Sequence, residues 1–181
     1  MNILDIENSL VLVIDVQERL VNMLEKDTVV IQTSKITQAA NILGIPVVIT
    51  EQYPKGLGVT VDGVKKTLSD GTSIYEKNAF SALENQDVLD ELKKSGRKQI
   101  VLCGIETHIC VHQTAAALIR EGFEVFVVKD ACASRKKYEF EQGIERMKDC
   151  GSHITCCEIV LFEWLKTSKH PNFKEIQALI K

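Results

Sequence analysis

The residue with the clearest chemical potential in this sequence is Cys110, which follows a short, mostly apolar run over residues 99–104. A run of this kind is typical of a strand that is buried on both faces. From Cys110 onward, apolar residues recur at helical spacing as far as Gly122, which predicts a helix whose first turn contains Cys110. That turn favours a thiolate over a thiol, because its N–H groups are free and the helix dipole is positive there. Cys110 is therefore a candidate nucleophile.

Asp15 and Lys77 could supply the other groups that a cysteine nucleophile needs. Asp15 ends an apolar run over residues 9–14, and Lys77 ends a second run over residues 72–77. A carboxylate at the end of a buried strand is partly desolvated, which suits it to accept the thiol proton. The Lys77 ammonium would keep Asp15 ionised, while backbone N–H groups of the turn over residues 105–110 would bind an oxyanion. This set predicts attack of sulfur on a carbonyl carbon.

Each of these residues also has an ordinary structural interpretation. A cysteine in an apolar segment is more often a packed core thiol, and an aspartate after a strand can cap the next helix. A lysine such as Lys77 is more often a solvated loop charge. Cys103 is a rival nucleophile, but its place inside the predicted strand favours burial. Only the combination of the three residues favours catalysis.

Two histidines near Cys110 suggest a cysteine–histidine pair. His108 and His112 each lie two residues from Cys110, however, so helix geometry points them away from it. We expect His108 at the rim of a substrate pocket and His112 in packing. Gln17 could contact substrate, hold the neighbouring carboxylate, or have a plain surface or capping role. Phe80 could stack on a substrate or pack in the core.

The elements that must position these residues alternate along the chain. Predicted strands cover residues 9–15, 45–50, 72–77, 99–104, 124–128 and 153–156, and predicted helices cover residues 28–43, 85–95, 110–121, 138–150 and 159–166. A short helix is expected near residues 64–68 and an amphipathic one beyond residue 171, and residues 134–135 should cap the helix at 138–150. This alternation implies a mainly parallel sheet with helices on both faces, and reactive groups at the carboxyl ends of its strands. We expect one α/β domain over residues 1–181.

Composition excludes several classes of partner. The 181-residue chain has a formal net charge of −3 with scattered Lys and Arg, so no nucleic-acid-binding face is expected. No apolar run reaches the ~18–20 residues of a membrane span, and residues 1–7 lack the features of a signal peptide. The six cysteines lie mostly in apolar segments, which argues against disulfides, and they include no C-x-x-C pair, which argues against a structural metal site. We expect a cytoplasmic protein that acts on a small molecule.

Four segments resemble the signature blocks of the isochorismatase-like cysteine hydrolases. They are VIDVQ at residues 13–17, EKNAFS at 76–81, GIETHICV at 104–111 and DACASR at 130–135. The blocks occur in the family's order and span nearly the whole chain. The resemblance implies a three-layer, doubly wound α/β fold with a six-stranded sheet of order 3-2-1-4-5-6.

Carried over by position, the resemblance also implies a catalytic triad of Asp15, Lys77 and Cys110. It further implies a cis peptide bond between Ile105 and Glu106, which would direct the N–H groups of Glu106 and Cys110 at the oxyanion. Glu106 is unusual at a place where relatives often carry a small residue. Its side chain is expected to line the pocket or to face an adjacent subunit, because the family also suggests a homo-oligomer.

One departure from the family concerns metal binding. Nicotinamidases carry a metal-binding Asp-x-His pattern after the second strand, whereas residues 50–58 here read TEQYPKGLG and the first half of the chain has no histidine. We therefore expect neither a metal nor a cofactor, and nicotinamide is disfavoured as a substrate. The run at residues 50–58 instead resembles the isochorismatase-domain-containing branch of the family.

The resemblance implies a reaction as well as a fold. True isochorismatases lack the cysteine nucleophile, so Cys110 disfavours isochorismate and points to an amidohydrolase. The implied reaction is hydrolysis of a small amide-like C–N bond through a thioester. Two alternatives remain: a catalytically silent interaction protein, and a nucleotide- or flavin-binding module on a similar sheet. The second is weakened because the chain contains neither G-x-G-x-x-G nor G-x-x-x-x-G-K-[ST].

Overall fold

The computed structural model describes residues 3–181, so residues 1 and 2, which begin the segment where no signal peptide is expected, lie outside it. Six strands form a sheet through the described residues: β1 (Ser9–Ile14), β2 (Val47–Gln52), β3 (Ser73–Lys77), β4 (Gln99–Ile105), β5 (Glu124–Ala133) and β6 (His153–Thr155). Their order is β3-β2-β1-β4-β5-β6, and each neighbouring pair is parallel. The predicted sheet order is confirmed.

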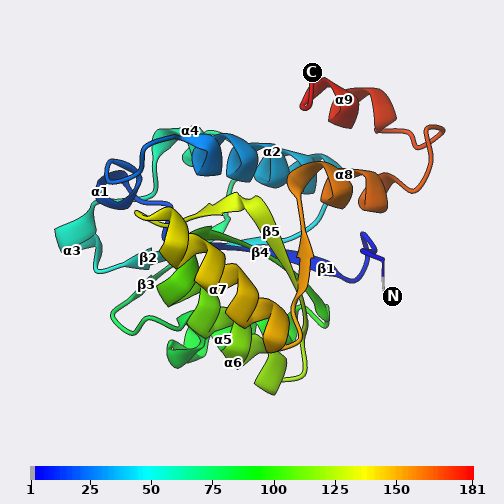
Figure 1. Cartoon of the computed structure of the whole chain (residues 1–181). Helices are drawn as coiled ribbons and strands as arrows, with labels where there is room; N and C mark the ends of the chain where they lie inside the picture. Colours follow the sequence, from blue (N-terminus) through cyan, green and yellow to red (C-terminus); the bar gives the residue numbers. More distant parts are fainter. Residues whose placement is uncertain (1–2) are drawn as a thin grey trace.

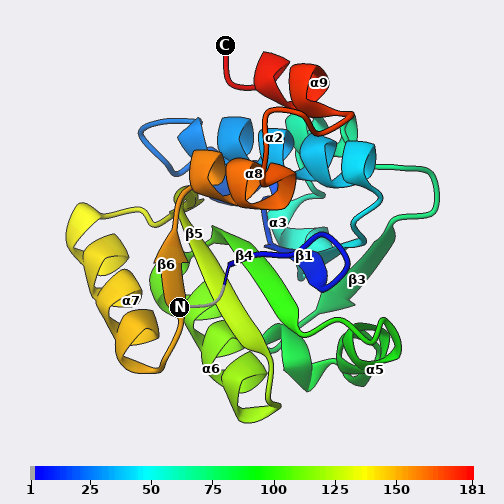
Figure 2. The same cartoon turned by 90° about the vertical axis from the view of Figure 1, so that its right-hand side faces the viewer.

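Helices cover both faces of the sheet. They are α1 (Glu18–Val21), α2 (Thr28–Leu43), α3 (Pro54–Leu57), α4 (Asp62–Lys65), α5 (Gln86–Lys94), α6 (His112–Arg120), α7 (Lys137–Asp149), α8 (Cys157–Leu165) and α9 (Phe173–Ala178). Figures 1 and 2 show α2, α4 and α8 over one face, and α5, α6 and α7 under the other. The outermost helix, α9, packs on α8 through Phe162 and Phe173, whose ring centroids are 6.4 Å apart. The predicted three-layer, doubly wound fold is confirmed.

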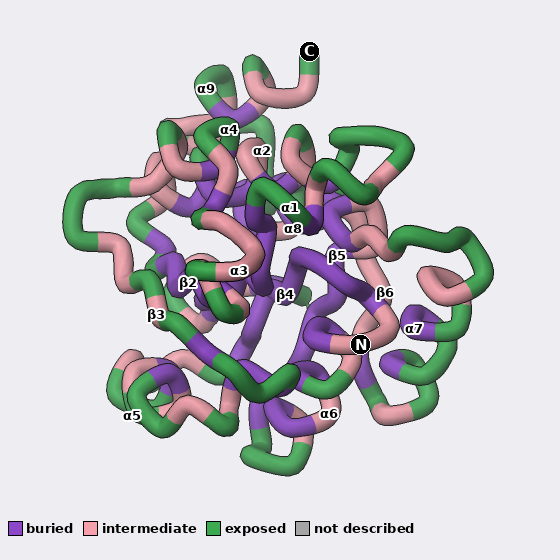
Figure 3. The backbone as a smooth tube through the Cα atoms, turned by 90° about the vertical axis from the view of Figure 1, so that its left-hand side faces the viewer, coloured by how far each residue is buried: buried purple, intermediate pink, exposed green. Residues whose placement is uncertain are grey.

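The central strands account for most of the core. Every residue of β1 and β4 is buried, whereas the edge strand β6 is only partly covered (Figure 3). Strands that are apolar on both faces must lie between two layers of helices, because neither face can remain in water. Parallel pairing of β1 with β4, which ends at Ile14 and Gly104, places the carboxyl ends of the two strands side by side.

Gly104 allows β4 to approach the end of β1 closely. Its φ angle is +134°, and a Cβ atom added there would lie 2.0 Å from the carbonyl oxygen of Ile14. Only glycine has both the conformational freedom and the lack of a side chain that this contact requires. A side chain at residue 104 would therefore push β1 and β4 apart at the point where the candidate site begins.

Several element boundaries differ from those expected. The strand β5 continues to Ala133, five residues past its predicted end, because its register with β4 shifts between Leu102 and Gly104 and pairing then resumes. The helix α1 was not expected. The helix predicted from Cys110 begins as a π-helical turn over Thr107–Val111 and becomes α-helical only at His112.

Within residues 3–181, no helix has both the length and the apolar character that crossing a bilayer requires.

Candidate active site

The site is built around Asp15, which directly follows β1. Its φ angle of +52° is in the left-handed region, which aspartate tolerates better than most residues. Its side chain is fully buried. Thr50 Oγ1, from β2, donates to Asp15 Oδ1 at 2.7 Å, and Lys77 Nζ donates to Asp15 Oδ2 at 2.7 Å. Both carboxylate oxygens therefore have fixed donors.

Lys77 ends β3 and reaches inward, so that its side chain is only 1% exposed. Besides Asp15, its ammonium donates to Gln52 Oε1 at 2.6 Å and to the carbonyl oxygens of Ala79 at 3.3 Å and Phe80 at 3.1 Å. A buried ammonium is costly unless it is paired and hydrogen-bonded. These contacts hold the charge of Lys77 in one position.

Cys110 lies in the π-helical turn that follows β4, and it is 6% exposed. Its thiol lies close enough to the Asp15 carboxylate and the Lys77 ammonium for both charges to shift its pKa. The fold therefore brings an acid, an amine and a sulfur together from separate strands, although Asp15 and Lys77 are 62 residues apart in the sequence. By contrast, Cys103 is fully buried inside β4.

The protonation of Cys110 differs from the expectation. Burial, followed by the negative charge of Asp15, raises the pKa of the Cys110 thiol to about 12, and the opposing effect of Lys77 is smaller. The prediction that the helix start would favour a thiolate is therefore wrong for the resting protein, because desolvation and the adjacent carboxylate both favour the thiol. Burial also raises the pKa of Asp15, although Lys77 and Thr50 oppose this effect.

The turn between β4 and Cys110 contains a cis peptide bond between Ile105 and Glu106. The carbonyl oxygen of Glu106 accepts hydrogen bonds from the N–H groups of Ile109 at 3.0 Å and Val111 at 3.3 Å. The Glu106 side chain points to the loop before α7, where its Oε1 accepts from Arg135 Nε at 2.8 Å. The side chain of Glu106 thus links this turn, residues 105–110, to that loop. We call residues 105–110 the reactive turn.

Gln17 has a structural role in the loop after β2, and its contact with substrate stays a prediction. It is fully buried, its Nε2 donates to the carbonyl oxygens of Gln52 at 3.0 Å and Gly58 at 2.6 Å, and its Oε1 accepts from the Gln52 N–H at 2.7 Å. These bonds use the polar atoms of its amide to fix the loop after β2. Phe80 is 53% exposed, so it does not pack in the core and its contact with substrate stays a prediction.

His108 points toward α7 and away from the thiol. Its Nδ1 lies 2.9 Å from Ser134 Oγ, and its Nε2 lies 3.7 Å from Glu139 Oε2. The prediction that residues 134–135 cap α7 is wrong: the N-cap is Lys136, and both residues bond instead to the reactive turn. A sequence cannot distinguish the two roles, because both place polar side chains before a helix.

Two further residues position the site but were not predicted from the sequence: Thr50 and Gln52, which contact Asp15 and Lys77. The sequence feature that could have indicated them is their position at the end of the second strand, within the run at residues 50–58. Neighbouring parallel strands end at the same edge of the sheet, so polar residues there are candidates for the same site.

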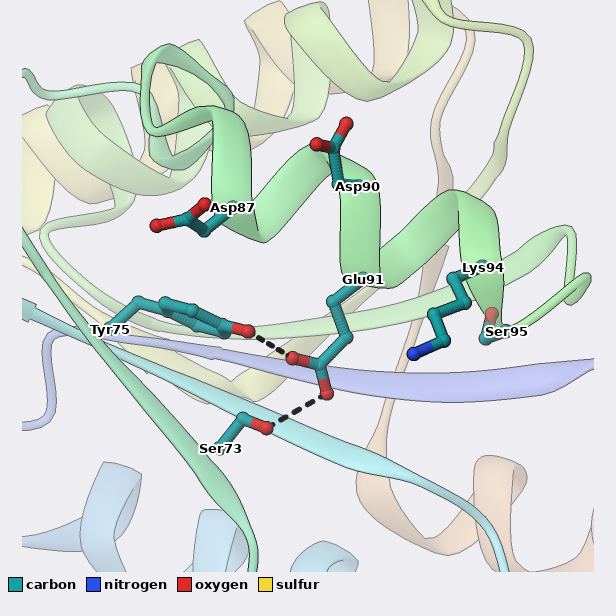
Figure 4. Close-up of a pocket in the computed structure, with 7 residues that line it drawn as sticks. All are labelled: Ser73, Tyr75, Asp87, Asp90, Glu91, Lys94 and Ser95. Carbon is teal, nitrogen blue, oxygen red and sulfur yellow. Dashed lines mark hydrogen bonds between the residues drawn. The ribbon is translucent and has the colours of Figure 1, made fainter.

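A pocket of about 210 Å³ is lined by Lys77 together with Tyr53 and Asn78, and two larger pockets lie elsewhere on the surface. The pocket in Figure 4, about 640 Å³, lies between β3 and α5, where Ser73 Oγ donates to Glu91 at 2.9 Å and the Tyr75 hydroxyl donates to the other oxygen of Glu91. A second pocket of about 700 Å³ lies between the start of α2, the end of β5 and α7. Neither of these two larger pockets is lined by a member of the Asp15–Lys77–Cys110 group.

Gly143 on α7 packs directly against the reactive turn. A Cβ atom there would lie 2.9 Å from the Cα and N atoms of His108 and from the carbonyl carbon of Thr107. We expect Gly143→Ala to lower the free energy of unfolding by about 2 kcal/mol, because backbone atoms cannot yield as a flexible side chain can. Urea denaturation measures this loss, and Gln142→Ala on the exposed face of α7 is the matched control. Equal stability of the two variants would contradict the close packing.

Comparisons with known proteins agree with this fold. Residues 9–159 match the family described as the isochorismatase domain. The isochorismatase domain-containing protein 1 of Danio rerio is 44% identical over 149 residues, which are 81% of this chain and 51% of that protein. The chain thus spans about half the length of that relative.

Solved structures give the same result. The MAR1 ribonuclease from Caenorhabditis elegans is 38% identical, with a TM-score of 0.93 over 99% of this chain and 92% of that one. The YcaC gene product of Escherichia coli, described as an octameric hydrolase of unknown specificity, has a TM-score of 0.87 at 24% identity over 97% of this chain and 95% of that one. With a family match that covers most of its length and a sheet of the expected order, this chain belongs to the isochorismatase family.

Proposed function

We propose that this protein is a cysteine hydrolase that cleaves a small amide-like C–N bond through a thioester. The observation that carries the proposal is the buried Asp15–Lys77 pair, 2.7 Å apart, whose charges act on the Cys110 thiol. A thiol of this kind needs a base at hand, since little thiolate exists at neutral pH. Asp15 is that base.

The acylation step transfers one proton and exchanges one bond. As Cys110 Sγ bonds to the carbonyl carbon, the thiol proton moves to Asp15 and the C=O electron pair moves to oxygen. Backbone N–H groups of Glu106 and Cys110 are the proposed donors to that oxyanion. When the C–N bond breaks, Asp15 returns the proton to the nitrogen, and the amine leaves.

The deacylation step repeats this chemistry with water. Asp15 takes a proton from the water that attacks the thioester, and the proton passes to the sulfur when the C–S bond breaks. Lys77 stays beside the developing thiolate throughout, because its four hydrogen-bond acceptors hold its ammonium in place. Asp15 therefore takes part in every proton transfer of the two steps.

The burial of Cys110 favours small substrates. Only 6% of the residue is exposed, so a bulky acyl group could not reach the sulfur. Phe80 and Tyr53, which are 53% and 55% exposed near the ends of β3 and β2, are candidate contacts for the rest of the substrate. The name ribonuclease is that of the C. elegans protein. Here the net charge of −3 offers no particular support for binding a polyanion.

A screen of small amides, ureas and hydroxamates tests the proposal. We expect the wild type to release amine and to show an acyl adduct on Cys110 in acid-quenched mass spectra, whereas Cys110→Ala shows neither. Cys103→Ala is the matched control, because Cys103 is buried away from the carboxylate and should leave turnover in place. Turnover that survives in Cys110→Ala would refute the mechanism. Labelled RNA in the same assay tests the ribonuclease alternative, and a bound nucleotide or flavin would favour the binding module.

We also propose that the chain forms a homo-oligomer. Support comes from the YcaC gene product, which is described as octameric, and from exposed apolar side chains such as Ile74 on the edge strand β3, which is 43% exposed. Analytical ultracentrifugation measures the state directly. A monomer at micromolar concentration would refute this part.

A further inference from the structure

A second group of polar side chains lies where the reactive turn packs against α7. Glu106, His108 and Glu139 each present one ligand atom there, and the three atoms lie within 4.8 Å of one another. Two carboxylate oxygens and one imidazole nitrogen suit borderline and hard divalent cations such as Mn²⁺, Fe²⁺ and Zn²⁺. We infer that these three residues form a divalent-cation site, although the sequence predicted no metal.

The first supporting observation is an oxygen without a hydrogen bond. Glu139 Oε2 is buried and accepts no hydrogen bond, and its polar neighbour His108 Nε2 is 3.7 Å away, beyond hydrogen-bonding distance. A buried carboxylate oxygen left unpaired is unfavourable. Two ligand atoms on one tetrahedral metal ion are about 3.4 Å apart, so a cation between these atoms would satisfy both with little movement.

The second observation is the orientation of the His108 ring. Its Nδ1 lies 2.9 Å from Ser134 Oγ, which leaves Nε2 directed at Glu139. Metal-binding histidines commonly use their other ring nitrogen in such a bond, which fixes the tautomer and the ring plane. Ser134 is therefore the expected outer partner of the ligand.

The surrounding charges leave the required atoms available. Both hydrogen bonds from Arg135, through its N and Nε atoms, go to Oε1 of Glu106, a residue that is 7% exposed. Lys136 lies 3.7 Å from Oε1 of Glu139, whereas Oε2 faces His108. These cations reduce the local negative charge, so the site should bind a metal ion with moderate affinity.

The site lies close to the surface, although Glu139 Oε2 itself is covered. The side chains of His108 and Glu139 are 21% and 28% exposed, so an ion can enter and water can complete its coordination. Because Glu106 and His108 belong to the turn that carries Cys110, a bound ion would brace that turn against α7.

Binding of Mn²⁺ to the full chain tests this inference. Mn²⁺ is chosen because it prefers oxygen and nitrogen donors, so the six free thiols compete little. The signal of free Mn²⁺ in electron paramagnetic resonance gives the number of sites and their affinity without any assay of activity. The variants are His108→Asn and Glu139→Gln, and the control is Glu141→Gln, a nearby α7 carboxylate whose ion pair with Lys129 is exposed.

We expect one saturable site per chain in the wild type and in Glu141→Gln, and at least about tenfold weaker binding in both ligand variants. Absence of saturable binding in the wild type, or equal affinity in all four proteins, would overturn the inference. The stability of metal-free Glu139→Gln distinguishes a ligand role of Glu139 from a merely structural one. A His108–Glu139 ion pair would make this variant less stable than the wild type, whereas an empty ligand site predicts equal or greater stability.

Discussion

Replacing Asp15 by asparagine is expected to abolish turnover and, at the same time, to make Cys110 react faster with iodoacetamide. Loss of the base should lower kcat by about 10³-fold, within the range that general acid–base groups supply. The thiol should nevertheless ionise more easily, because the negative charge of Asp15 raises the pKa of Cys110. Without its carboxylate partner, Lys77 would pair with the thiolate instead. Alkylation at pH 8 should therefore be about tenfold faster, since one pKa unit changes the thiolate fraction tenfold.

The pH dependence of the wild type checks the same argument. Because the pKa of Cys110 is about 12, its alkylation rate should rise tenfold per pH unit from pH 7 to 10 without a plateau. Turnover should fall at low pH as Asp15 is protonated, and at a higher pH than for an exposed aspartate, because burial raises the pKa of Asp15. Asp62→Asn, in the short helix α4, is the control. Slower alkylation in Asp15→Asn, or a plateau near pH 7, would contradict the assigned roles.

Replacing Gly104 by alanine is expected to cause a large loss of stability. The new Cβ atom would lie 2.0 Å from the carbonyl oxygen of Ile14, and alanine would also have to adopt a φ angle of +134°. Two fully buried strands cannot separate without exposing the core, so we expect the free energy of unfolding to fall by at least about 4 kcal/mol.

Gly44→Ala provides the comparison for this prediction. Gly44 also has a positive φ angle, +68°, but a Cβ atom there would have no neighbour within 4 Å. Gly44→Ala should lower the free energy of unfolding by only about 1–2 kcal/mol, which is the penalty of the left-handed conformation for alanine. Chemical denaturation of both variants separates the clash from the backbone effect. Similar losses in the two proteins would show that β1 and β4 can move apart.

The fold could be predicted where local pattern and burial agree. The apolar runs of β1 and β4 predicted strands because only a central position in a sheet buries both faces. The end of β5 could not be predicted, because residues 129–133 include Lys129 and Asp130 and pair with β4 only after a register shift. Such a shift depends on the neighbouring strand and leaves no trace in local composition.

The candidate site also has features that local sequence predicts and features that depend on distant residues. Asp15, Lys77 and Cys110 could be singled out because each lies at or just beyond a strand end, where the parallel sheet gathers its polar groups. The role of Gln17 was missed because its partners lie 35 and 41 residues away in sequence. The thiolate prediction failed for a related reason: the helix dipole is a local property, whereas desolvation depends on the whole fold.

The all-parallel order of the sheet has a consequence for when the chain acquires its chemistry. Lys77 comes from β3, its support Gln52 from β2, Asp15 from the end of β1 and Cys110 from the turn after β4, so four adjacent strands each contribute one group. A slip of one residue in any of these pairings would turn a contributing side chain to the other face. During synthesis, Cys110 therefore meets Asp15 and Lys77 only after β4 has docked beside β1, so we expect the proposed acylation chemistry to begin only at that stage.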